Sequence, residues 1–283
     1  MNWRALLVLL RPHQWLKNLM LYFPPLLAGI APGTFSPARW LLPFVLFALI
    51  SSAAYVLNDL IDVEADRLHP RKCRRPLPSG AVAEQQALLL LLILLLLAFF
   101  LCFRGLPALW PYAAGYLLLS LLYSLALKRY PLCDLLGIAA LFLVRLQAGG
   151  AAFDVRVSPW LFASVLWLAL FLSAGKRLSE AHLLGAGAQR HRKVLGVYRP
   201  RFLFLMVYAS ALAALLTYAG YVVVHPAMAR WLTLPLCVLG LWRYVSRVRQ
   251  GGDGDPTAAL LRDPILFVIA LSWAMLVGLA AYG

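Results

Sequence analysis

The chain has 283 residues, 63% of them hydrophobic and 13% charged, and a formal net charge of +15. A soluble domain of this length carries about a quarter charged residues and about half apolar ones. The composition therefore argues against a soluble protein and indicates a polytopic membrane protein. The positive excess does not require a nucleic-acid partner, because membrane topology and phosphate-rich ligands account for it.

Apolar stretches of transmembrane length follow one another along almost the whole chain. A helix needs about 20 apolar residues to cross the hydrocarbon core of a bilayer. Prolines such as Pro24-Pro25, inside the first stretch, are tolerated within a helix bundle. We expect an all-α membrane protein forming one domain over residues 1–283, with nine spans near 16–31, 39–58, 83–102, 108–127, 131–150, 157–175, 202–223, 228–248 and 263–281.

The basic residues are distributed unequally between the two sides of these spans. The N-terminal segment and the connections after the second, fourth, sixth and eighth spans hold 21 of the 26 Lys and Arg residues, and the other connections hold four. Such an asymmetry marks the cytoplasmic side of a membrane protein. We therefore predict a bacterial inner-membrane protein with a cytoplasmic N-terminus. After an odd number of spans, its C-terminus is periplasmic.

Three acids are stacked at the end of the second predicted span. In "NDLIDVEADR", Asp59, Asp62 and Asp66 have the spacing i, i+3 and i+7, which places them on one face of a helix. Three carboxylates on one stripe repel each other unless a cation lies among them. Oxygen ligands suit Mg²⁺, which typically binds through one or two carboxylates together with substrate phosphates. The stripe therefore predicts a magnesium and diphosphate site.

A plainer interpretation of the same stretch needs no metal. The acids would then pair with Arg67, Arg71 and Arg74 at the membrane surface. Against this, ionisable groups at the end of a span usually line a functional cavity. Glu64 falls off the stripe and is expected to face solvent or a base.

The stretch resembles a known family signature. Asn58-Asp59-x-x-Asp62-x-x-x-Asp66, followed by Lys72, Arg75 and Pro76, is similar to the NDxxDxxxD motif of the UbiA superfamily of intramembrane prenyltransferases. In that family, helices surround a central cavity, Asp-rich motifs hold Mg²⁺ on a diphosphate, and a lateral opening admits an isoprenoid chain. The resemblance implies a cavity open to the cytoplasm in which the three stripe acids are catalytic and hold the metal. It also implies that Asn58, Lys72 and Arg75 bind substrate.

Five shorter motifs point to one branch of the superfamily. They are similar to those of decaprenyl-phosphate phosphoribosyltransferases, which join 5-phosphoribose from phosphoribosyl diphosphate to a polyprenyl phosphate and so supply the precursor of an arabinofuranose donor. The motifs are "RPHQWLKN" from Arg11, "YSLALKR" from Tyr123, "SPW" from Ser158, "GKRLSE" from Gly175 and "LLRDP" from Leu260.

The second acidic motif departs from the superfamily pattern. Relatives that act on prenyl diphosphates commonly carry DxxxD between the sixth and seventh spans, whereas this chain has Lys176, Arg177 and a single acid, Glu180. Exchanging a carboxylate for bases disfavours a second metal ion and favours direct binding of phosphate. All three residues are predicted to bind substrate. The alternative for the two bases is that they are ordinary positive-inside anchors.

Further charged or polar residues complete the predicted site. Lys17 and Asn18 are expected at the cavity mouth, and Tyr123, Lys128 and Arg129 are expected to clasp phosphate at the end of the fourth span. The roles of two more residues, Asp134 and Arg145, are left open. Asp134 has the chemistry to take a proton, bind metal or pair with Lys128. Arg145, deep within a span, needs a partner or a wet cavity, since charge there is costly.

The sequence therefore predicts a Mg²⁺-dependent transferase acting on phosphoribosyl diphosphate and a membrane polyprenyl phosphate. Its closest rival is transfer of a prenyl group to an aromatic acceptor such as 4-hydroxybenzoate or a naphthoate, which a second DxxxD would have favoured. A transporter is a more remote alternative, because nearly all the charge lies on one face. The sequence leaves a homo-oligomer open.

Overall fold

The chain folds almost entirely into helices in a computed structural model that describes residues 3–68, 72–184, 198, 200–225, 227–252 and 254–282. The longer helices are α1 (Trp3–Leu10), α3 (Pro37–Ile61), α5 (Glu84–Gly105), α6 (Trp110–Leu125), α7 (Cys133–Ala152), α8 (Pro159–Leu184), α11 (Pro200–Val224), α13 (Thr233–Arg249) and α15 (Pro264–Tyr282). The shorter helices are α2 (Phe23–Leu27), α4 (Val63–Arg67), α12 (Met228–Trp231) and α14 (Pro256–Arg262). Short 3₁₀ segments join them: η1 (Pro12–Tyr22), η2 (Pro32–Thr34), η3 (Lys72–Arg74), η4 (Pro107–Leu109) and η5 (Leu127–Arg129).

Among the described residues, seven helices are long and apolar enough to cross a membrane. They correspond to the second to seventh predicted spans and the ninth. The other two predicted spans are interrupted. Residues 16–31 form the 3₁₀ segment η1 and the short α2, where Pro24 and Pro25 remove backbone donors. Residues 228–248 divide between α12 and the 17-residue α13.

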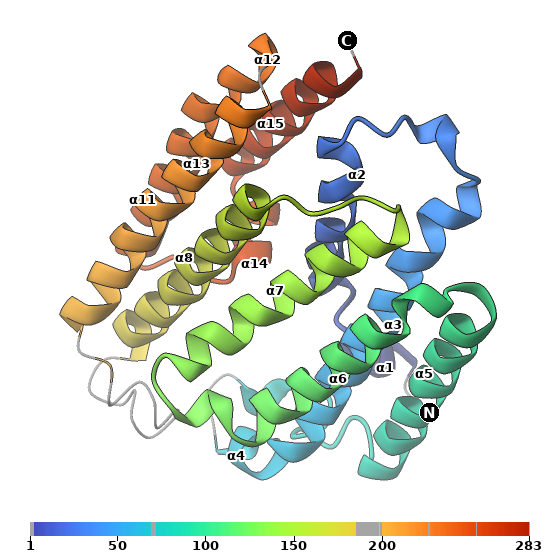
Figure 1. Ribbon diagram of the computed structural model, residues 1–283. Helices are drawn as coiled ribbons and strands as arrows, with labels where there is room; N and C mark the ends of the chain where they lie inside the picture. The colour runs from blue at the N-terminus through green and yellow to red at the C-terminus, as the bar shows by residue number, and fades with distance from the viewer. Residues whose placement is uncertain are drawn as a thin grey trace.

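The long helices pack side by side in a bundle, with α7 between α8 and α6 (Figure 1). α8 packs against α11 on one side and α7 on the other. Beyond α7, each helix packs against the next in the order α6, α3 and α5. The η1 segment contacts α3, α7 and α14. α5 and α15 expose most of their apolar side chains, as lipid-facing helices do, whereas α7 and α8 are largely buried.

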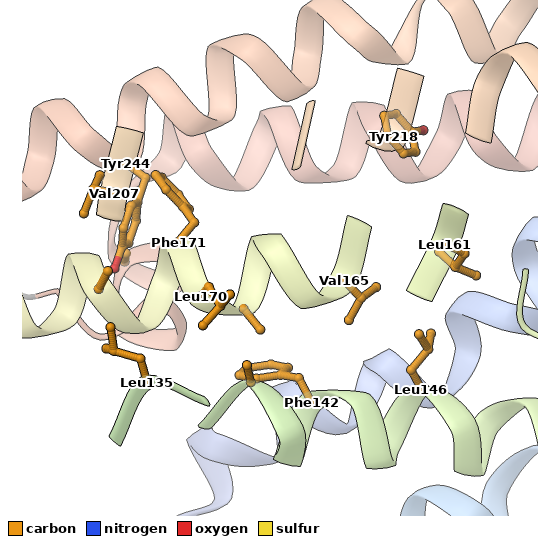
Figure 2. Close-up of a cluster of buried hydrophobic side chains, with 14 of the residues drawn as sticks. Leu135, Phe142, Leu146, Leu161, Val165, Leu170, Phe171, Val207, Tyr218 and Tyr244 are labelled. Atoms are coloured by element: carbon orange, nitrogen blue, oxygen red, sulfur yellow. The ribbon is translucent and has the colours of Figure 1, made fainter. Parts of the chain in front are cut away.

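The largest apolar core lies between α7, α8 and the C-terminal helices. Figure 2 shows the α7 side chains Leu135, Phe142 and Leu146 directed towards side chains of α8. On the other side of α8, Tyr218 of α11 and Tyr244 of α13 belong to the same core. This packing fixes α7 and α8, the two helices that carry the buried residues Asp134, Arg145 and Arg177.

One glycine brings the N-terminal segment against α7. A Cβ at Gly149 would lie 2.2 Å from the backbone oxygen of Leu21, a distance that no larger residue tolerates. The close approach places η1 beside α7 about one turn from Arg145. As a result, Lys17 and Asn18 of η1 face the interior of the bundle.

Candidate active site

A cavity of about 570 Å³ occupies the centre of the bundle and is strongly cationic. Nine of its lining residues are bases and three are acids: Arg11, Lys17, Lys72, Arg75, Lys128, Arg129, Arg145, Lys176 and Arg177 against Asp62, Asp66 and Glu180. Three further acids, Asp59, Asp134 and Asp255, pair with lining bases from behind. The excess of bases over acids suits anionic ligands.

Each stripe acid has a basic partner in the cavity wall. Asp62 lies 2.6 Å from Lys128 Nζ, and Asp66 accepts a 2.6 Å hydrogen bond from Arg75. The same Arg75 nitrogen lies 3.1 Å from Asp59, so one guanidinium joins the first and last acids of the stripe. Asp59 also accepts from Arg11 Nη2 at 2.6 and 2.9 Å.

The helix does not continue unbroken through the stripe. α3 ends at Ile61, and Asp62, with φ −95° and ψ 3°, separates it from α4. Asp62 and Asp66 line the cavity, whereas Asp59 lies behind it and is 2% exposed. Asp59 and Asp66 therefore share Arg75, while Asp62 pairs separately with Lys128, and no cluster of three metal-ligating side chains exists in the described part of the chain.

The surface-pairing interpretation of the stretch differs from the observed pairs. Arg67 pairs with the exposed Glu64 and with Glu84, both away from the stripe. Arg71 lies outside the described residues. The stripe acids do form ion pairs, but with bases of the cavity wall, and these bases come from the residue before η1, from η3 and η5, and from the segment after η3.

The remaining residues of the first motif and of span four also meet at this end of the cavity. Asn58 accepts a 3.0 Å hydrogen bond from Ser124, which ties α3 to α6. Lys72 lies 3.3 Å from Asp66. Tyr123 and the exposed Arg129 line the cavity as well. Cavity-lining side chains thus come from both predicted motifs and from the end of span four.

Arg177 belongs to a buried charge cluster. Its Nε lies 2.8 Å from Asp134, which also accepts a 2.8 Å hydrogen bond from Tyr123, and its Nη1 pairs with Glu180. Arg177 is 2% exposed and Asp134 is fully buried. This arrangement joins α6, α7 and α8 and answers one open question, since Asp134 pairs with Arg177 rather than with Lys128.

Asn18 is fully buried and does not line the cavity. Its Oδ1 accepts a 2.9 Å hydrogen bond from Arg145 Nε. The guanidinium of Arg145 also donates to Tyr116 Oη at 2.6 Å and to the Leu141 carbonyl at 3.0 Å. Asn18 therefore orients a cavity base from behind, and Arg145 has both polar partners and a cavity beside it, as its position requires.

Sequence reasoning missed two residues of this wall. Arg11 has a left-handed backbone (φ 52°) at the start of η1, a conformation that costs energy and directs its side chain to Asp59. Asp255 lies 3.0 Å from Lys176 and caps α14 through the backbone N–H groups of Thr257 and Ala258. An Asp-Pro pair before a helix is a recognisable start signal, but nothing in the sequence connects it with Lys176.

The pKa of the Asp255 carboxyl reflects these neighbours. Burial alone would raise this pKa, but the charges of Lys176 and Lys17 and the backbone hydrogen bond from Ala258 hold it below its usual range. Asp255 therefore stays ionised at neutral pH. Among the described residues, it supplies the negative charge that these two lysines share.

A second cavity, about 360 Å³ and lined almost wholly by apolar side chains, lies between α2, α8, α11, α13, α14 and α15. Leu172 and Pro256 line both cavities, so the apolar space adjoins the cationic one. The junction lies one helical turn from Lys176 on α8 and next to Asp255. This pair of cavities suits a ligand with a charged head and an apolar chain.

Comparison with known proteins agrees with this architecture. Residues 21–271 match the UbiA prenyltransferase family. The chain belongs to this family. It is accordingly an enzyme, a membrane transferase with transmembrane helices, which removes the transporter alternative.

Two similar relatives carry a more specific name. The chain is 32% identical over 282 residues to a decaprenyl-phosphate phosphoribosyltransferase of Mycobacterium tuberculosis, covering 97% of this chain and 93% of that protein. It is 32% identical over 284 residues to the protein of the same name from Corynebacterium glutamicum, covering 96% and 85%. The resemblance inferred from the short motifs is thereby confirmed.

The fold is similar to that of a UbiA homolog from Archaeoglobus fulgidus bound to GPP and Mg²⁺, with a TM-score of 0.77 and 20% identity over 98% of this chain and 99% of that one. This likeness confirms the all-helical fold. The donor set here is compatible with the same type of metal, because Asp62 and Asp66 present hard carboxylate oxygens to the cavity.

Proposed function

We propose that this protein transfers 5-phosphoribose from phosphoribosyl diphosphate to a polyprenyl phosphate and releases diphosphate. The observation that carries the proposal is the cationic cavity joined to an apolar one, in a chain about one third identical to decaprenyl-phosphate phosphoribosyltransferases along nearly its whole length. Both substrates of that reaction bear phosphate, and the acceptor also bears a long apolar chain.

The donor's diphosphate is assigned to the end of the cavity that holds the acid stripe. Asp62 and Asp66 would hold Mg²⁺, which would supply positive charge to the leaving diphosphate. Lys128, Arg75 and Lys72 now neutralise these carboxylates and are partly exposed. They are within reach of a diphosphate at the same place, and Arg129 adds a base with no acid partner among the described residues.

The acceptor is assigned to the junction of the two cavities. Its chain would lie in the apolar cavity and its phosphate near Lys176, because Leu172 and Pro256 line both spaces. A phosphate monoester is already ionised at neutral pH, so its oxygen attacks the anomeric carbon without a general base. The bond from this carbon to the diphosphate breaks, the diphosphate leaves with the electron pair, and attack from the opposite face inverts the anomeric centre.

The wall residues contribute mainly by position and charge. Two anionic substrates repel each other in water, and a cavity with more bases than acids screens that repulsion. The apolar surroundings limit access of water, which would otherwise compete as the nucleophile. Positioning and fixed positive charge are therefore expected to supply most of the rate enhancement.

One assay tests the proposal. Purified protein receives phosphoribosyl diphosphate labelled in the ribose, together with polyprenyl phosphate or polyprenyl alcohol, with and without Mg²⁺. We expect a labelled lipid with the phosphate and Mg²⁺, and none with the alcohol or without the metal. Formation of a prenylated aromatic product from a prenyl diphosphate and 4-hydroxybenzoate, with no phosphoribosyl lipid, would replace this function with the aromatic-acceptor one.

We also propose that all nine predicted spans cross the inner membrane, including the two interrupted ones, and that the cationic cavity opens to the cytoplasm. In support, its charged lining residues come largely from the connections after the second, fourth and sixth spans, which are rich in bases. Reporters fused after Pro78 and at the C-terminus should read cytoplasmic and periplasmic, respectively. A periplasmic signal from the Pro78 fusion would place the site on the wrong side for a soluble donor.

A further inference from the structure

The deep end of the cationic cavity contains two bases without an acid of their own. Arg145 donates hydrogen bonds to Asn18, Tyr116 and the Leu141 carbonyl, all neutral acceptors. Lys17 also lines the cavity, and among the described residues it forms no ion pair. Lys17 lies close enough to Arg145 for the two charges to repel. Two neighbouring cations in a membrane protein need a counter-charge, and the described residues supply too little of it.

The missing negative charge can be counted from the neighbouring side chains. Lys17 and Lys176 share one acid, Asp255, which pairs directly with Lys176 and acts on Lys17 through space, and no acid of the described residues pairs with Arg145. Two positive charges therefore remain uncompensated at this end. A phosphate monoester carries about −1.5 to −2 charges at neutral pH, which matches them.

This end is separate from the acid stripe. It is also separate from the Arg177 cluster, because along α7 Arg145 lies 11 residues beyond Asp134, about 16 Å along the helix axis. The hydroxyls of Tyr116 and Ser120 line the cavity here and add donors, whereas none of the three stripe acids contacts Arg145. A ligand at this end therefore meets bases and hydroxyls, and the one carboxylate nearby that acts on Lys17, Asp255, is paired with Lys176 and does not line the cavity.

We propose that Lys17 and Arg145 form a phosphate-monoester subsite, with Asn18 and Tyr116 as positioning residues that orient the Arg145 guanidinium. The proposal rests on the proposed function for its two sources of ligand, the 5-phosphate of the ribosyl donor and the phosphate of the lipid acceptor. Both present the same dianionic group. The counter-ion that this end requires is then the substrate itself.

Asn18 offers a test that leaves both bases in place. Asn18→Asp keeps the oxygen that Arg145 contacts and adds the missing negative charge, whereas Asn18→Ser removes the contact and adds none. Binding of dodecyl phosphate and of ribose 5-phosphate to the full-length purified protein is measured by calorimetry without Mg²⁺, with dodecanol and ribose as neutral controls. We expect Asn18→Asp to bind phosphate roughly 10- to 100-fold more weakly than the original protein and more weakly than Asn18→Ser.

The ligand whose binding is weakened shows which substrate supplies the phosphate. Loss confined to ribose 5-phosphate assigns the subsite to the donor, and loss confined to dodecyl phosphate assigns it to the acceptor. Unchanged binding of both by Asn18→Asp, or equal weakening by Asp and Ser, would overturn the proposal. Turnover of the original protein is scored separately, so failure of the phosphoribosyl transfer assay is distinguishable from failure of this subsite.

Discussion

Two charged clusters of the cavity wall use the same ion-pair chemistry in different surroundings. At the stripe, Asp62 and Asp66 pair with Lys128 and Arg75, bases that keep between 18% and 29% of their side chains exposed. In the other cluster, Arg177 and Asp134 are both almost completely buried. The first cluster keeps its bases partly exposed, and the second is buried and joins three helices.

The two clusters differ in whether another group can replace one member of an ion pair. A partly exposed base can leave a carboxylate for a phosphate at little cost, because water and the ligand solvate both groups during the exchange. A buried pair has no such substitute, and removing one member leaves an uncompensated charge. We infer that the stripe pairs are exchanged during binding, whereas the Arg177 cluster is part of the scaffold.

The largest expected effect comes from breaking the stripe. Asp62→Asn should lower turnover at least about 100-fold, because the amide keeps the shape of the side chain but loses the charge that the metal and Lys128 require. The melting temperature in detergent should change little, since the pair is partly exposed. Initial rates and melting curves are measured together.

Glu64→Gln is the matched control, because Glu64 has the same chemistry but is exposed and pairs with Arg67. It should keep activity within about twofold. Equal loss of activity from both variants would indicate that surface pairing, rather than substrate binding, explains the acids.

A substitution in the buried cluster should lower stability, whereas the stripe substitution lowers turnover. Arg177→Met should reduce the free energy of unfolding by about 3–5 kcal/mol, since it leaves Asp134 charged and without its base in the interior. Arg67→Gln, which breaks exposed pairs, should cost about 1 kcal/mol or less. Equilibrium unfolding in detergent measures both.

A stable Arg177→Met variant with a raised KM for a phosphate-bearing substrate would reverse the assignment. Arg177 would then bind substrate, as its position in the second motif predicts. The result distinguishes a scaffold residue from a ligand-binding one, which the buried contacts favour.

Much of this arrangement follows from local sequence. Hydropathy predicts the seven long helices because each must satisfy its backbone hydrogen bonds within the bilayer. The interrupted segments are harder to predict: the 3₁₀ conformation of η1 depends on close packing against Gly149, a contact between residues 128 positions apart.

The site shows the same division between local and distant information. The spacing of the stripe acids predicts that they lie near one another, and Arg75 does join Asp59 to Asp66. The roles of Asn18, Arg145 and Asp255 depend on contacts between η1, α7 and α14, which no local pattern contains. Charge type was predictable, but the pairing of charges across helices was not.

A third ion pair, between Lys176 and Asp255, lies at the junction of the two cavities, and its lysine is about as exposed as the stripe bases. Lys176→Ala should weaken binding of polyprenyl phosphate by about 1.5–3 kcal/mol through loss of a charge-assisted contact. Lys176→Arg should retain most of the affinity, because it keeps the charge beside Asp255. An unchanged KM for the lipid in the alanine variant would remove Lys176 from the acceptor site.

The smallest expected effect is a pH dependence that separates Asp255 from a similar residue. Asp255 and Asp263 each precede a proline and cap a helix, and each has a pKa below its usual range. Burial alone would raise the pKa of Asp263, but backbone hydrogen bonds from Leu266 and Ile265 and contacts with Arg243 lower it. Only Asp255 adjoins the cationic cavity. The two residues therefore form a matched pair.

A carboxyl whose pKa is lower in the folded state stabilises the fold above its unfolded pKa of about 3.9, and this contribution is lost as the pH falls through the folded value. Asp255→Asn and Asp263→Asn should each cost about 1–2 kcal/mol of unfolding free energy at pH 7, and the difference from the original protein should shrink below about pH 4. Unfolding is measured from pH 7 to pH 3. Bound dodecyl phosphate should alter the pH profile of the original protein and of Asp263→Asn in the same way, because both keep Asp255. A different response in Asp255→Asn links that carboxyl to the phosphate site, and identical responses in all three proteins would make Asp255 a helix cap alone.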